Sequence, residues 1–481
     1  MTPTTPTITA DSTGAGPLVD LDVVDATLRE ALRAGGEWAE LFAEDRSSTG
    51  VLFDEGRVEE MNSGRDRGVG IRVTAGEVTG YAHTSDMTPE GLADAARTAA
   101  AVATRSPGGG TVDMESFRGG GTTEPRVKVL PTTVGADRKV ALLRAADEAA
   151  RSTHEAITQV TARYADSRRR ILVANSHGVC AADDQVRTLF SVSCVASGDG
   201  GLQTGRETVG YTVGWELFDD CDPAELAQRA AQRAVTKLAA RPAPSGEVPV
   251  VIARGGGGVL FHEACGHGLE ADLVRKGASV FRDRVGSQVA AEGVTLVDDG
   301  TMGPEWGALR IDDEGHPTQR NVLISDGVLS DYMWDWLRSR DDGRAPSGNG
   351  RRQSYTHLPM VRMTNTFVTN GDIDPDDIIA DTPTGVYVAQ LGGGQVNTAT
   401  GDFVFGMTEA YLIEDGKITE PLREGNLIGN GPQVLVDIDA IGNDFAMGHP
   451  GTCGKDGQGV PVGDGQPTLR VRALTVGGTA A

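Results

Sequence analysis

Two successive stretches of this chain have the same plan, in which helical hydrophobic patterns enclose period-two segments. This plan restricts the fold more than any other feature of the sequence. In the first stretch a helical pattern, two period-two segments around glycine-containing turns and a second helical pattern follow one another, at residues 21–34, 51–61, 68–84 and 88–106. In the second stretch two helical patterns enclose three period-two segments, at residues 136–152, 156–166, 168–182, 187–198 and 222–241. The two stretches are too dissimilar to indicate a duplication. Each predicts strands of an antiparallel sheet flanked by helices.

The remainder of the chain has a different pattern. It follows a proline-rich linker at residues 241–247 and is rich in period-two segments, with Asp-Gly hairpin signals in residues 321–333 and 410–422. Only the stretch around residue 262 is strongly helical. We therefore predict an α+β fold: an N-terminal α/β part, and a β-rich, barrel-like C-terminal domain that carries one helix. The expected boundaries are a disordered tail at 1–19, two α/β domains at 20–125 and 126–243 with a Gly/Pro/Thr-rich connector at 107–125, and the β-rich domain at 244–481.

Composition excludes several classes of protein. The chain has 481 residues, 39% of them hydrophobic, and a mean hydropathy of −0.24, which is typical of a soluble globular protein without a membrane span. The first residues have neither a basic region nor an apolar segment of a secretory signal, so a cytoplasmic location is expected. A net charge of −24 argues against direct nucleic-acid binding. Five scattered cysteines indicate reduced thiols that are free to bind metal.

The predicted helix of the C-terminal segment contains two histidines around a glutamate, in the string LFHEACGHGLEAD at residues 260–272. In zinc proteases of the H-E-x-x-H type the histidines are four residues apart and share one helix face. His262 and His267 are five apart, and a regular α-helix would turn them about 140° away from each other. Gly266 and Gly268 favour a local i to i+5 turn or an early helix end, and either would permit a shared metal. The preceding glycines, residues 255–258, lack the P-loop lysine and indicate a flexible turn.

A catalytic zinc site needs a third protein ligand and one open position. The candidates on residue type alone are Cys265, Glu270, Asp272, His449 and Cys453. Cys265 is equally well explained as a small buried apolar residue, and the two acidic residues could instead orient an imidazole. Residue type and spacing do not choose among them.

Four long strings resemble the TldD/PmbA peptidase family on its TldD side: GGGGVLFHEACGHGLEADLVRKGASVF, NGRRQSYTHLPMVRMTNTFV, LGGGQVNTATGDFVF and GTCGKDGQGVPVGDGQPTLRVRALTVGGTA. The resemblance extends from about residue 38 to the C-terminus. It implies a zinc-dependent peptidase that acts on unfolded or short peptides. It also implies a heterodimer with a TldE (PmbA) paralogue that lacks the motif, although a homodimer is the other expectation.

Site roles follow from that resemblance. It implies His262, His267 and Cys453 as zinc ligands and Glu263 as the general base, whereas the family pattern does not reserve a cysteine at Cys265, which is expected to pack. Zinc is the expected metal, with no other cofactor. Two pairs of residues are weaker candidates: Tyr355 and His357 could stabilise the oxyanion, and Gln395 and Asn397 could contact a peptide bound by strand addition.

Two alternatives stay open at this point. The protein could be a peptide-binding modulator with a structural zinc, which would need a fourth protein ligand. It could also be a regulatory subunit with a decayed motif, although the intact histidines, glutamate and Cys453 argue against that.

Overall fold

The computed structural model describes residues 16–33, 36–103, 126–199, 201–397, 399–423 and 425–478. Residues 1–15 of the predicted tail at 1–19, and the whole predicted connector at 107–125, lie outside the described residues. The predicted α+β fold is confirmed, with an antiparallel sheet and its helices followed by a β-rich domain that contains a closed barrel. No described helix combines the length and apolar character needed to cross a bilayer.

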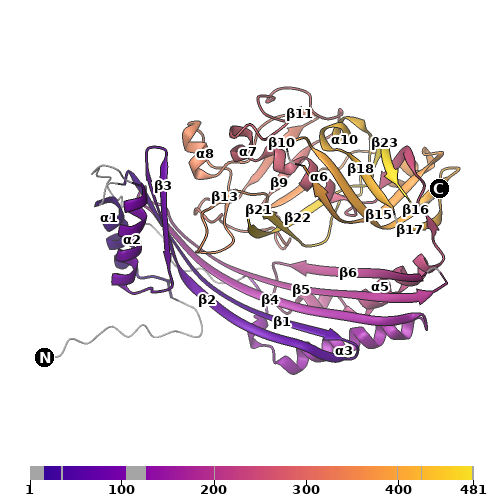
Figure 1. Ribbon diagram of the computed structural model, residues 1–481, viewed down its shortest axis with the longest axis horizontal. Helices are drawn as coiled ribbons and strands as arrows, with labels where there is room; N and C mark the ends of the chain where they lie inside the picture. Colours follow the sequence, from indigo (N-terminus) through magenta and orange to yellow (C-terminus); the bar gives the residue numbers. More distant parts are fainter. Residues whose placement is uncertain are drawn as a thin grey trace.

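Both N-terminal stretches contribute three strands to one six-stranded antiparallel sheet, in the order β3-β2-β1-β4-β5-β6. β1 and β4 form its middle and pair without a register shift from Glu40 opposite Asn175 to Asp54 opposite Thr161. The strands are β1 Trp38–Asp54, β2 Arg57–Ala75, β3 Val78–Thr84, β4 Ile157–Asn175, β5 Cys180–Gly198 and β6 Gly201–Tyr211. The long strands curve beneath the C-terminal domain (Figure 1).

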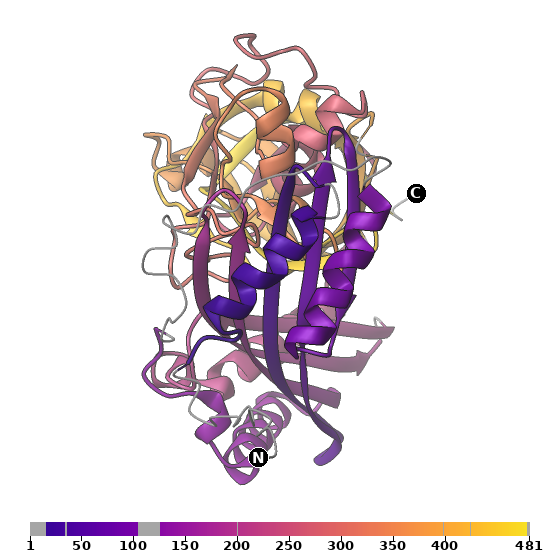
Figure 2. The same cartoon turned by 90° about the vertical axis from the view of Figure 1, so that its left-hand side faces the viewer.

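Two helix pairs cover one face of this sheet. The pairs are α1 Leu21–Arg33 with α2 Pro89–Ala103, and α3 Ala136–Thr153 with α5 Pro223–Leu238; the short η1 Pro131–Thr133 and α4 Leu217–Asp220 lie in the connections. Side chains alternate between the two faces along β1. Leu41 packs in the cluster of α1 and α2, and Phe53 packs in the cluster of α3 and α5. Phe42 points the other way and packs against Tyr355 of the C-terminal domain. Figure 2 shows α1 and α2 on the outer side of the strands.

The C-terminal domain is built around a closed barrel of five strands, in the order β15-β8-β23-β18-β16, closed by pairing of β15 with β16. A second sheet has the order β11-β10-β9-β14-β22-β20, with β21 paired to β22. The barrel strands and their neighbours are β7 Arg241–Pro242, β8 Gly246–Ile252, β15 Thr384–Val396, β16 Asp402–Glu414, β17 Lys417–Arg423, β18 Asn426–Asn430, β19 Ile438–Ile441 and β23 Leu469–Gly477. The remaining strands are β9 Leu296–Asp299, β10 Arg320–Ser325, β11 Val328–Leu329, β12 Gly350–Arg351, β13 Met360–Val361, β14 Asn365–Val368, β20 Ala446–Met447, β21 Gly451–Lys455 and β22 Gln458–Gln466.

Both Asp-Gly hairpins are present. Asp326 and Gly327 join β10 to β11, Asp415 and Gly416 join β16 to β17, and all four residues have positive φ, as the tight hairpin turn requires. The prediction of one helix in this domain was incomplete. Besides the helix at residue 262, its described residues contain four α-helices too short for a hydrophobic period to be read: α7 Ala271–Arg275, α8 Trp336–Asp341, α9 Pro375–Ala380 and α10 Gly431–Asp437.

Buried ion pairs join the sheet to the C-terminal domain. Arg72 of β2 lies between two carboxylates, 2.8 Å from Glu40 of β1 and 2.7 Å from Glu314 of the C-terminal domain. All three side chains are at most 2% exposed. Removal of one partner from such a group leaves an uncompensated buried charge. The network therefore fixes how the C-terminal domain sits on the sheet.

Candidate metal centre

The helix that carries His262 ends one residue after Glu263. α6 comprises Gly258–Ala264, Cys265 departs from helical geometry with φ −123° and ψ −50°, and a 3₁₀ turn η2, Gly266–Leu269, follows. A Cβ at Gly266 would lie 2.2 Å from the sulfur of the buried Met363, so any other residue at this point would have to displace that side chain. This break turns His267 back towards His262, and the two ring centroids lie 5.3 Å apart. An early helix end therefore compensates for the extra residue in the motif.

Cys453 approaches these histidines from β21. Its Sγ atom lies 3.3 Å from Nε2 of His267, although the two residues are 186 positions apart in the chain. One ligand atom from each of His262, His267 and Cys453 lies within 4.8 Å of the others, and all three residues are buried. The structure thus brings together the two histidines of the motif and one of the five candidates for a third ligand.

These three residues fit a zinc ion. Both ring nitrogens of His262 are buried without a hydrogen-bond partner among the described residues, which is costly unless a ligand satisfies them. Burial raises the pKa of the Cys453 thiol, but the two imidazoles beside it outweigh burial and lower that pKa to about 4. The cysteine is therefore available as a thiolate, and two imidazoles with one thiolate form a ligand set typical of catalytic zinc.

Three further charged groups hold His267 in place. Nδ1 of His267 lies 3.0 Å from a carboxylate oxygen of Glu270, and Lys455 Nζ donates to Glu270 at 2.9 Å and to Asp272 at 2.7 Å. Burial raises the pKa of Glu270, but His267 and Lys455 outweigh it and lower that pKa to about 2. A buried carboxylate on Nδ1 leaves Nε2 as the nitrogen that faces Cys453 and a metal.

Glu263 is the carboxylate of the motif that faces solvent. It lies on α6 directly after His262, its side chain is 31% exposed, and its Oε2 lies 3.6 Å from Nε2 of His267. The carboxylate is therefore reachable by water and lies close to the nitrogen of His267 that faces Cys453.

Family models of the PmbA/TldA metallopeptidases match three successive segments: domain 1 at residues 39–103, the central domain at 130–238 and the C-terminal domain at 245–478. The chain belongs to the PmbA/TldD metallopeptidase family. A metalloprotease TldD homolog of Haemophilus influenzae is 38% identical over 451 residues, which cover 92% of this chain and 93% of that protein. One from Buchnera aphidicola subsp. Acyrthosiphon pisum (strain APS) is 36% identical over 482 residues, or 98% of this chain and 99% of that protein. The solved TldE of Thermococcus kodakarensis shares the fold, with a TM-score of 0.77 at 19% identity over 94% of this chain and 99% of that one.

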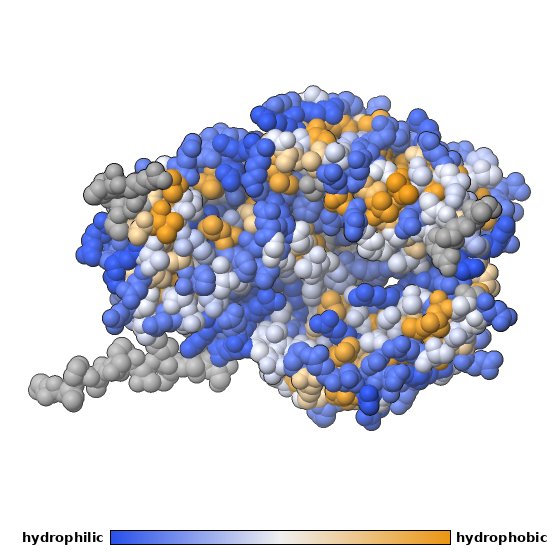
Figure 3. All heavy atoms as spheres, viewed as in Figure 1, coloured by the Kyte–Doolittle hydropathy of each residue, from blue (hydrophilic) through white to orange (hydrophobic). Residues whose placement is uncertain are grey.

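A cleft of about 550 Å³ begins beside the first residues of α6 in this PmbA/TldD-family chain, and its described lining does not include His262, His267 or Cys453. One wall consists of β5, β6 and α5, the other of barrel residues 390–393, and the end near the motif consists of Gly258, Val259 and Asp464. Figure 3 shows the surface hollowed between the C-terminal domain and the strands beneath it. An extended chain can therefore reach α6 from outside.

The weaker candidates lie elsewhere. The Tyr355 hydroxyl donates to Asp66 at 3.2 Å, and the residue packs at the seam between sheet and C-terminal domain. His357 Nδ1 contacts the hydroxyls of Ser354 and Thr356. Gln395 and Asn397 are exposed near the end of the β15–β16 hairpin, and neither is among the described residues that line the cleft. Their roles with substrate stay predictions.

Cys265 and His449, which were also candidates for the third ligand, lie outside the group of three clustered ligand atoms. Cys265 is 1% exposed in the main core of the C-terminal domain, and burial raises the pKa of its thiol. It is absent from the group of metal-ligand atoms found among the described residues. His449 is exposed, lines the cleft, and its Nδ1 lies 2.8 Å from the carbonyl oxygen of Thr208.

Sequence reasoning missed two residues of the site. Lys455 follows Cys453 by two positions on β21, so the alternation of a strand places both side chains on one face, and that spacing could have indicated it. Asp464 of β22 lines the cleft beside α6. Its partial burial raises the pKa of its carboxyl to about 6, against the opposing effect of His262. Nothing in its local sequence marked it.

Proposed function

We propose that this chain is a zinc-dependent peptidase that hydrolyses peptide bonds in unfolded proteins and short peptides, in the cytoplasm. The observation that supports it most is the group of three buried ligand atoms within 4.8 Å, with the partly exposed Glu263 beside them. Two imidazoles and one thiolate from the protein leave a fourth position free, as catalytic zinc requires. A structural zinc in a peptide-binding modulator would need a fourth protein ligand, and the group found among the described residues has three.

His262, His267 and Cys453 would hold the ion, and a bound zinc supplies a Lewis acid for the scissile carbonyl. Glu263 accepts the proton of the attacking water and then donates it to the leaving amine. Its partial exposure permits water to reach the carboxylate, while the buried Glu270 and Lys455 keep His267 from rotating.

The cleft supports an extended substrate. Its barrel wall is β15, whose pairing with β16 shifts register between Val388 and Gly394, and Gly392 and Gly393 line the cleft there. Glycines without side chains let a peptide backbone approach the strand, and backbone hydrogen bonds tolerate many sequences. A cleft of about 550 Å³ accommodates a short extended segment and excludes a folded domain. Access, more than side-chain pockets, would then set specificity.

The experiment is digestion of one sequence in a folded and an unfolded form by the zinc-loaded protein, with products identified by mass spectrometry. We expect cleavage of a casein-like disordered chain and of the unfolded form only. The Glu263→Gln variant is the matched control, since it keeps all three ligands. Equal rates on the folded and unfolded forms would contradict the proposed mode of binding.

We also propose that the chain acts in a heterodimer with a TldE/PmbA-like paralogue that lacks the motif. The cleft opens at the surface of this chain, and a partner of the same fold could cover it. Light scattering and peptidase assays with and without the paralogue test this. Full activity of a strictly monomeric preparation would contradict it, and a homodimer with full activity would replace the paralogue by a second copy.

A further inference from the structure

A second cavity, of about 160 Å³, lies at the seam between the sheet and the C-terminal domain, apart from the metal ligands. Its volume is well above the roughly 10–15 Å³ that one water molecule needs. The ionisable side chains that line it are five arginines and one aspartate: Arg46, Arg169, Arg187, Arg351, Arg352 and Asp313. In a chain with a net charge of −24, such a concentration of positive charge requires an explanation.

Two of these arginines are neutralised by the protein. Arg169 forms ion pairs with Glu44 and with Asp313, the latter at 2.8 Å. Arg352 pairs with Glu40. Asp313 is fully engaged, because its other carboxylate oxygen accepts a hydrogen bond from the Arg352 backbone N–H at 2.8 Å.

The other three arginines have no carboxylate partner among the described residues. Arg187, 5% exposed, donates to the carbonyls of Trp306 and Ala308 and to the Gln185 side chain. Arg351, 3% exposed, donates to two backbone carbonyls, those of Met363 and Pro461. Arg46 stands at the exposed side of the cavity.

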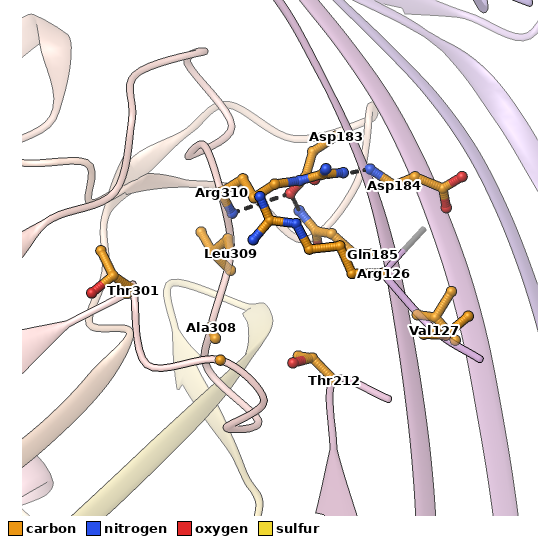
Figure 4. A pocket seen from close by; sticks show the side chains of 13 residues that line it. Arg126, Val127, Asp183, Asp184, Gln185, Thr212, Thr301, Ala308, Leu309 and Arg310 are labelled. Atoms are coloured by element: carbon orange, nitrogen blue, oxygen red, sulfur yellow. Dashed lines mark hydrogen bonds and ion pairs between the residues drawn. The ribbon is translucent and has the colours of Figure 1, made fainter. Parts of the chain in front are cut away.

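The nearby carboxylate of Asp183 is already occupied. It accepts from Arg310 Nε at 2.5 Å and from the Gln185 amide at 3.1 Å, at an adjoining cavity of the same seam (Figure 4). Burial, reinforced by the charge of Arg351, lowers the pKa of Arg187 to about 9, and burial lowers the pKa of Arg351 to about 10. The charge of Asp183 acts on Arg187 and that of Asp313 on Arg351, but neither buried guanidinium group forms an ion pair among the described residues.

Buried cations are costly unless they are paired, and guanidinium groups match the oxygens of phosphate with two parallel N–H donors each. We propose that this cavity binds one free inorganic oxyanion of the phosphate type between Arg46, Arg187 and Arg351. Donors that come from both the sheet and the C-terminal domain suit a tetrahedral ion better than a planar carboxylate. The cavity size suits the free ion. Thr452 and Pro461 of the β21–β22 hairpin form part of the wall, so the ion would bind next to the hairpin that carries Cys453.

The test is isothermal titration of the metal-loaded protein with inorganic phosphate in a chloride buffer of constant ionic strength. We expect one saturable site with a Kd of about 1 mM or tighter, and no saturable heat with acetate. Absence of a saturable phosphate signal would overturn the proposal. Equal binding of acetate would overturn the choice of a tetrahedral ion, and tighter binding of phosphoserine would overturn the choice of a free ion.

Two variants locate the site. Arg351→Gln removes a buried donor and Arg46→Gln an exposed one, and each should weaken phosphate binding about tenfold or more. Arg46 is exposed, so its replacement leaves the fold intact even if the Arg351 variant is unstable. Arg320→Gln, at an exposed position of β10, is the matched control and should bind phosphate as the unmodified protein does. Unchanged affinity in Arg46→Gln together with Arg351→Gln would place the ion elsewhere and overturn the assignment.

Discussion

Nδ1 of His267 lies 3.0 Å from a carboxylate oxygen of Glu270, whose side chain has no exposed surface. Lys455 donates to the same carboxylate oxygen, at 2.9 Å. Glu270→Gln keeps the shape of the side chain but removes the negative charge that orients His267, so zinc affinity should fall about 10- to 100-fold without complete loss of the metal. Competition with a chromogenic chelator measures this. An unchanged zinc affinity would show that His267 needs no such support.

Glu263 is expected to affect turnover and not metal binding. Glu263→Gln and Glu263→Ala remove no ligand, so zinc content should stay at that of the unmodified protein while hydrolysis falls by about 10²-fold or more, the usual contribution of a general base. Metal analysis and peptide cleavage on the same preparation give both values. Normal turnover by either variant would exclude Glu263 as the base.

The two buried cysteines near the site should respond in opposite ways. Cys453→Ala should lose zinc, activity and several degrees of thermal stability together, because the ion would join α6 to the β21–β22 hairpin and metal binding is coupled to folding. Cys265→Val is a near-isosteric change inside an apolar core, so it should keep zinc and cost less than about 1.5 kcal/mol. Retained zinc in the Cys453 variant, with loss in the Cys265 variant, would reverse the assignment.

A buried acid at the seam should make stability depend on pH. Asp335 caps α8, accepts from the Arg338 N–H and is 3% exposed; burial, reinforced by the charge of Glu314, raises its pKa from 3.8 to about 7. The folded state therefore holds a proton that the unfolded state has released, so this group's stabilisation is complete below about pH 4 and is lost as the pH rises to about 7.

Asp335→Asn keeps the capping oxygen and cannot ionise. Relative to the unmodified protein, the variant should gain stability on the order of 2 kcal/mol between pH 4.5 and 7.5. Urea unfolding at both pH values measures the difference. Asp374→Asn, at the exposed N-cap of α9, is the matched control for a change of cap. An equal effect of Asp335→Asn at both pH values would contradict the shifted pKa.

Much of the fold could be predicted because it depends on local patterns. The alternation at 51–61, 68–84, 156–166, 168–182 and 187–198 and the Asp-Gly turns at 326 and 415 are properties of short segments, and the structure has strands and turns there. The first part of β1, at 38–50, and all of β6 were not predicted. The pairing of β1 with β4 was not predicted, because it depends on which long strands share an apolar face across more than 100 residues. Short helices such as α9 have too few residues for a period and were missed for that reason.

The candidate site likewise has some features that local sequence could predict and others that it could not. The spacing of His262 and His267, together with the glycines at 266 and 268, indicated an interrupted helix, and the structure has the interruption at Cys265. Choosing Cys453 over His449 required the family resemblance, because neither residue type nor spacing states which loop reaches α6. Asp464 could not be found at all: its position beside α6 exists only once β22 is paired within the folded domain.

The β1–β4 pairing has a consequence for synthesis on the ribosome. Thr161, the partner of Asp54, emerges 107 residues later. At about 5–20 residues per second, β1 therefore waits on the order of 5 to 20 s with one side of its backbone unpaired. An edge of this length is a template for association with other chains. During those seconds the nascent chain would depend on chaperones, and slow codons before residue 157 would lengthen its exposure.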